Sequence, residues 1–195
     1  MRRMIAEAGF SRFGALKTLS FACDSRTGAE ALVASGCLKG VFPAFMGTGL
    51  VHTKKLHGAA AAKSEEEYAC SIVSALFRHL SRATAGSPVI AGAGLEYVRL
   101  LAKFFENRGE KVDRLVELRV AYSQRPSEGA GDASDDDDDD EEAVRSNAYT
   151  LERVDIIIKT LLADTGDSGD EATDALVREV SGALRQRLTA QGIEM

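Results

Sequence analysis

The stretch FFENRGEKVDRLVEL, residues Phe104–Leu118, decides the fold of this chain of 195 residues. Asn107-Arg108-Gly109 predicts a break, because Asn and Gly tolerate the left-handed backbone conformation that ends helices. The apolar residues after the break recur at helical spacing between charged ones, which predicts an amphipathic helix; they are Val112, Leu115, Val116, Leu118 and Tyr122. The stretch therefore predicts a helix, a tight break and a second helix. This is the unit of a stacked-helix scaffold, and it contains no obvious catalytic chemistry.

The segment before this stretch has the same helical character. Short amphipathic helices are expected over Phe13–Cys23 and Ala29–Ala34, followed by the densely apolar segment Cys37–Met46. Two short helices and a longer apolar one, within about 40 residues, are typical of an armadillo-type repeat.

Further helices are expected on both sides of the stretch. Gly47–Lys63 is predicted to be a loop, and Ser64 with Glu67 forms a capping-box pattern that predicts a helix start. Apolar residues at helical spacing also predict helices over Tyr149–Ala163 and Glu171–Gln191. Strands alternating with helices are missing. The predicted fold class is all-α: part of an armadillo- or HEAT-like helical repeat stack, an α-α superhelix.

Composition limits the class of protein. No run approaches the roughly 18 apolar residues that a membrane span needs, and the N-terminus does not have the pattern of a signal peptide. Cys23, Cys37 and Cys70 form no CxxC pair, so neither a zinc site nor a disulfide framework is indicated. We expect all three to be buried free thiols in a reducing compartment.

The charge is unevenly distributed. The net charge is −6, yet Ser127–Glu142 alone holds ten acidic residues and no basic one, which leaves the rest mildly basic. Gln124–Asn147 is of low complexity and nearly free of large apolar groups, so disorder is predicted there. The predicted organisation is armadillo-like repeats over residues 1–123, an acidic disordered loop over 124–147, and C-terminal helices over 148–195 that continue the stack.

The acidic run allows two interpretations. It is a solvated spacer that keeps the protein soluble, or it contacts a basic peptide or the chain's own basic surface. The residues proposed for such a contact are Asp135, Asp136, Asp137, Asp138, Asp139, Asp140, Glu141 and Glu142.

Other functional classes find little support. Gly92-x-Gly94 imitates a dinucleotide-binding loop, but Tyr97 stands where the third glycine of that fingerprint belongs. His52 and His57 lack further ligands at close spacing, so no metal is expected. No serine lies in a nucleophile elbow. Basic residues are scattered and aromatic stacking platforms are absent, so direct nucleic-acid binding is not expected. We expect no enzyme and no cofactor.

Three blocks of the chain resemble the beta-catenin-like family of armadillo-type, spliceosome-associated proteins. They are Ala15–Ala22 together with Gly36–Met46, then Glu65–Leu80, then Phe104–Leu118. Their order agrees with the family, the similarity covers roughly residues 13 to 160, and it concerns only the C-terminal half of the family's members. No block of the sequence resembles the family's N-terminal repeats.

The resemblance implies a fold and a function. It implies an armadillo superhelix that acts in the nucleus as a non-enzymatic spliceosome scaffold, associated with the nineteen complex. The implied partners are splicing-factor proteins with basic segments, with neither nucleic acid nor membrane bound directly, and self-association through uncovered repeat faces is expected. Two alternatives stay open: an armadillo-type adaptor for basic peptides outside the spliceosome, and a nucleotide-dependent enzyme using Gly92 and Gly94.

Overall fold

A computed structural model describes residues 4–5, 10–80, 94–124, 137–164 and 170–193, with side chains at all of these except 10 and 137–143. Nearly all the described residues are helical and none is in a strand, which confirms the all-α prediction. No helix in this part is long and apolar enough to cross a membrane. The helices are α2 (Phe10–Ala22), α3 (Arg26–Ala34), α4 (Leu38–Phe45), α5 (Leu50–Leu80), α6 (Leu95–Ser123), α7 (Asp137–Ala163) and α8 (Glu171–Ala190).

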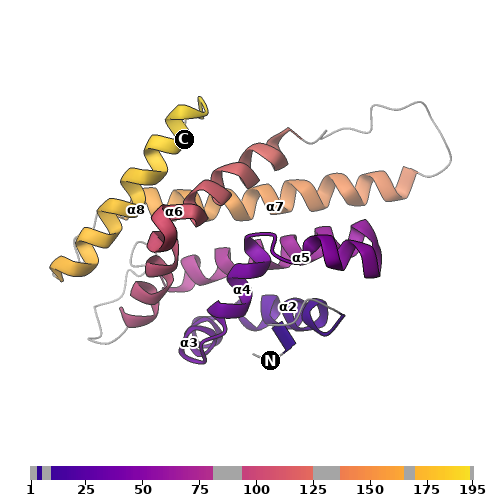
Figure 1. Ribbon diagram of the computed structural model, residues 1–195, viewed down its shortest axis with the longest axis horizontal. Coiled ribbons are helices and arrows are strands. Elements are labelled where there is room, and N and C mark those ends of the chain that lie inside the picture. Colours follow the sequence, from indigo (N-terminus) through magenta and orange to yellow (C-terminus); the bar gives the residue numbers. More distant parts are fainter. Residues whose placement is uncertain (1–3, 6–9, 81–93, 125–136, 165–169, 194–195) are drawn as a thin grey trace.

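Helix α5 is the centre of the stack. It packs against α2, α3 and α4 on one side and against α7 on the other, while α6 and α8 cover the end of the pair α5–α7 (Figure 1). Each helix buries one stripe of side chains against its neighbours, the arrangement that amphipathic helices adopt when they stack.

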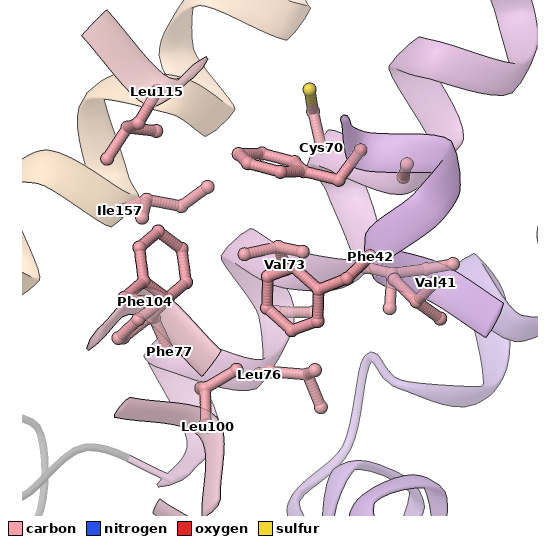
Figure 2. Packing of buried hydrophobic residues seen from close by; sticks show 14 of the residues in the cluster. Val41, Phe42, Cys70, Val73, Leu76, Phe77, Leu100, Phe104, Leu115 and Ile157 are labelled. Atoms are coloured by element: carbon pink, nitrogen blue, oxygen red, sulfur yellow. The ribbon is translucent and has the colours of Figure 1, made fainter. Parts of the chain in front are cut away.

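An aromatic cluster forms the core where α4, α5 and α6 meet. The ring of Phe104 lies 5.6 Å from that of Phe42 and 5.3 Å from that of Phe77, in edge-on arrangements. Leu115 of α6 and Ile157 of α7 lie on the side of the cluster away from Val41 of α4 (Figure 2). Edge-to-face contacts are favourable beyond the burial of their area, so this cluster joins the first half of α6 to the centre of the stack.

The predicted break in α6 is confirmed. Asn107, Arg108 and Gly109 have φ angles of 53°, 60° and 81°, all in the left-handed region. The five apolar residues that the sequence placed on one stripe after the break are all buried. The two halves of α6 can therefore point in different directions while each buries its own stripe.

Arg187 of α8 forms hydrogen bonds with residues at the break. Its Nη2 donates a hydrogen bond to the carbonyl oxygen of Arg108 at 3.2 Å, and its Nε donates to the carboxylate of Asp113. A carbonyl of the break thus accepts a hydrogen bond from a charged donor. Helix α8 is held against α6 at the point where the chain turns.

The prediction of a loop over residues 47–63 is wrong. Helix α5 begins at Leu50 and is interrupted only at Gly58, where φ is 88° and ψ is 173°. Four alanines follow this kink, and alanine has the highest helix propensity. Ser64 consequently lies inside the helix and caps nothing; Glu67 accepts a hydrogen bond from Ser146 at 2.6 Å instead.

The acidic region also differs in part from its prediction. Helix α7 begins at Asp137, so disorder does not hold for residues 137–147, whereas residues 125–136 lie outside the described part. A helix N-terminus carries partial positive charge, so acidic residues favour a helix start at that place. The argument from composition did not include this effect.

We predict opposite effects for two glycine substitutions. Gly109→Ala should destabilise the fold by about 1 kcal/mol, because its positive φ disfavours any side chain. Gly182→Ala, in the interior of α8 with no atom near the added methyl group, should stabilise it by up to about 1 kcal/mol. Urea unfolding measures both free energies. Equal effects of the two substitutions would show that Gly109 is not in a left-handed conformation.

Candidate functional site

An open pocket of about 420 Å³ lies between α4 and α6. Its apolar lining comes from α4 and the residue after it: Leu38, Phe42, Pro43 and Met46. Its polar lining is mostly charged and comes from both sides of the break in α6 as well as from α4 and the following turn: Lys39, Thr48, Lys103, Glu106, Glu110 and Lys111.

The break in α6 assembles the charged rim. Lys103 precedes the break and Glu106 opens it, while Lys111 belongs to the second half of the helix. Lys103 Nζ lies 2.6 Å from Glu106 Oε1, and Lys111 Nζ lies 3.6 Å from Glu106 Oε2. One carboxylate is therefore shared by two lysines from opposite sides of the break.

The second carboxylate of the rim is engaged as well. Glu110 Oε1 accepts hydrogen bonds from Lys111 Nζ at 2.6 Å and from Asn107 Nδ2 at 2.8 Å. These hydrogen bonds, that from Lys111 first, hold the pKa of Glu110 below its usual value. The Lys111 side chain is only 6% exposed, so this lysine is fixed in place between Glu106 and Glu110.

A largely buried polar network joins α4, α5 and α6. Glu66 of α5 accepts hydrogen bonds from Arg114 Nη2 and, at 2.9 Å, from the hydroxyl of Tyr122, both on α6. Arg114 Nε also donates to the carbonyl oxygen of Phe45 at 3.2 Å, at the end of α4. Glu66 thus joins the second half of α6 to α5, and Arg114 joins it to α4.

A second buried ion pair joins α2 to α5. Arg12 and Glu65 lie 3.9 Å apart with almost no exposed surface, and Thr53 donates to Glu65 at 3.1 Å. Because Thr53 and Glu65 lie on opposite sides of the kink at Gly58, their contact holds the two halves of α5 together. Neither charge can reach a solute, so the pair has a structural role.

The acidic residues proposed as a contact site are only partly described. Asp135 and Asp136 lie outside the described residues, and residues 137–142 form the first turns of α7, where only the backbone is described. Their contact with a basic peptide stays a prediction.

The glycine pair and the histidines form no site in the part that the structure describes. Gly92 lies outside it, and Gly94 directly precedes α6. Tyr97 is buried and donates a hydrogen bond from its hydroxyl to Asp164 Oδ2 at 2.6 Å, so its role is in packing. Among the described residues, no group of three or more His, Cys, Asp or Glu side chains could hold a metal.

All three cysteines are buried free thiols. Burial raises the pKa of Cys23 to about 12, and burial also raises the pKa of Cys70. Since the thiolate is the reactive form, these side chains behave as small apolar groups of the core.

The pocket is the feature that the sequence did not reveal. Its two walls are far apart in the chain, and periodicity identifies buried stripes without saying which helices face each other. The signal that was present is local: the charged residues Lys103, Glu106, Glu110 and Lys111 cluster around the predicted break. In the structure, these four residues form the charged rim of the pocket, at the place where the backbone of α6 changes direction.

We predict a clear difference between two carboxylates that contact the same arginine. Glu66→Gln should destabilise the fold by about 2 kcal/mol, because the Glu66 side chain is only 11% exposed and its loss removes the least exposed charged partner of Arg114. Glu117→Gln should cost less than about 0.5 kcal/mol, because that side chain is 65% exposed. Thermal and urea unfolding compare the two, and equal losses would contradict the assignment of Glu66 as the buried tie.

Comparisons with known proteins agree with this architecture. A sequence profile of the family described as catenin-beta-like, Arm-motif containing nuclear proteins matches residues 1–187. Beta-catenin-like protein 1 from Rattus norvegicus is 36% identical over 126 residues, and the proteins of that name from Homo sapiens and Bos taurus are 35% identical.

The similarity covers different shares of the proteins compared. It extends over 63% of this chain but over only 20% of each of these relatives, so the match spans about a fifth of their length. No solved structure matches the chain significantly. The profile nevertheless covers nearly the whole of the described fold, and the chain belongs to the catenin-beta-like family of nuclear proteins with armadillo motifs.

Proposed function

We propose that this chain is a non-enzymatic scaffold that binds proteins of the spliceosome, associated with the nineteen complex, and acts in pre-mRNA splicing in the nucleus. The observation that carries this proposal is the family match over residues 1–187, whose description names both the armadillo motif and the nucleus. Stacked helical repeats bind proteins through extended surfaces, and the helices of this chain pack against one another in such a stack.

The interior of the fold supports a scaffold as well. Glu66 with Arg114, and Arg12 with Glu65, are buried pairs that join helices to each other. Buried ion pairs of this kind fix the geometry of a fold more than they stabilise it.

Charge suggests one class of partner. The acidic residues Asp135 to Glu142 are consecutive, and such runs attract basic segments over a distance. We propose that splicing factors with basic segments bind there. The relatives are much longer than the matched region, so the proposal concerns only partners that this region can hold.

Affinity purification from nuclear extract tests the proposal. The immobilised chain should recover splicing proteins, and replacing residues 135–140 with Ser should reduce that recovery severalfold, because the attraction for basic segments is lost. Replacing the same residues with Glu keeps the charge and should retain the recovery.

Two outcomes would contradict the proposal at different levels. Recovery of splicing proteins no greater than from empty beads would refute the role in splicing and would favour an adaptor outside the spliceosome. Equal recovery by the Ser and Glu variants would leave that role intact but would remove the acidic residues as the contact.

A further inference from the structure

The pocket between α4 and α6 has one lysine available to a partner. Glu106 and Glu110 each form an ion pair with a lysine of the same rim. The distance is 2.6 Å from Lys103 Nζ to Glu106 Oε1 and 2.6 Å from Lys111 Nζ to Glu110 Oε1. Lys39 is exposed and has no carboxylate partner in the part of the chain that the structure describes. Three lysines against two carboxylates also leave the rim with a net positive charge.

The apolar lining sets what can enter beside Lys39. Pro43 and Met46 are only partly buried, while Phe42 packs on Phe104 in the core (Figure 2). A volume of about 420 Å³ is near the lower end of the range for ligand pockets. It accommodates one or two side chains and not a whole helix.

We propose that this pocket binds a segment of a partner protein that presents an apolar side chain next to a carboxylate. The apolar side chain packs on Pro43 and Met46, and the carboxylate pairs with Lys39. This inference rests on the proposed function as a protein-binding scaffold and adds the chemistry of a second partner class. It is distinct from the basic segments proposed for the acidic residues 135–142.

A basic segment fits this pocket poorly. To reach a carboxylate of the rim, it would have to displace Lys103 from Glu106 or Lys111 from Glu110. Lys111 is nearly buried and belongs to the second half of α6, so its displacement would disturb the fold beside the break. An acidic segment can pair with Lys39 without displacing another residue of the rim.

The probe is a set of three eight-residue peptides added to the nitrogen-labelled full chain. The acidic peptide is Ser-Glu-Glu-Leu-Leu-Glu-Glu-Ser; in the second, Lys replaces every Glu, and in the third, Ala replaces both Leu. Backbone amide signals in NMR spectra report where each peptide binds. The acidic peptide should shift the signals of Lys39, Thr48 and Glu110. The basic peptide should shift signals elsewhere, and the alanine peptide should bind severalfold more weakly.

Two charge reversals form the matched pair of variants. Lys39→Glu should weaken binding of the acidic peptide by about fivefold, as expected for losing one exposed ion pair. Lys17→Glu changes the net charge by the same amount on an exposed residue of α2 outside the pocket and should leave the affinity nearly unchanged. Both residues are exposed, so neither substitution should unfold the chain.

Several results would overturn the pocket assignment. In the peptide titration, the acidic peptide would fail to shift the pocket signals at low-millimolar concentration, or the basic peptide would shift them more. In the comparison of variants, Lys39→Glu and Lys17→Glu would have equal effects on the affinity. If splicing proteins are still recovered from nuclear extract in that case, the scaffold role stands and only the pocket fails. If the acidic peptide binds as expected but no splicing proteins are recovered, the pocket stands and the splicing role fails.

Discussion

The break at residues 106–109 of α6 is the constraint on which the rest of the fold depends. Two non-glycine residues, Asn107 and Arg108, adopt the left-handed conformation there, at a cost of about 1–2 kcal/mol each, and less for Asn. Burial of the apolar stripe of the second half of α6 stabilises the fold by more than this cost, since each large apolar side chain contributes about 1.5–3 kcal/mol. Packing therefore outweighs the local strain. Phe104 before the break and Leu115 after it are both buried in the same core (Figure 2).

Charged side chains complete what apolar packing begins. Arg187 binds the backbone of the break, and Arg114 joins the second half of α6 to Glu66 of α5 and to the end of α4. Because an unpaired buried charge is costly, these pairs favour one arrangement of the helices over others of similar apolar burial. The same geometry places lysines and glutamates from both sides of the break around one pocket. The break at residues 106–109 therefore determines both the packing of α6 and the position of the pocket's charged residues.

The sequence predicted those features that have a local cause. The break follows from Asn107 and Gly109, and α8 follows from the apolar spacing over Glu171–Gln191. The Asp170 carboxylate accepts a hydrogen bond from Thr173 N at 3.1 Å and caps the start of α8. Helix α5 was missed over residues 50–63 because a glycine and two lysines resembled a loop. Thr53 donates a hydrogen bond to Glu65 across the kink, and periodicity does not show such a contact. The pocket was missed for the same reason: its walls meet only after folding.

Solution NMR of α6 tests the central claim most directly. The account predicts that Asn107 and Arg108 have three-bond amide–α-proton couplings and chemical shifts of positive φ, larger in coupling than those of the flanking helical residues. It also predicts nuclear Overhauser effects between the Arg187 side chain and the residues of the break. Helical couplings and shifts without interruption from Leu95 to Ser123, with no contact to Arg187, would contradict it.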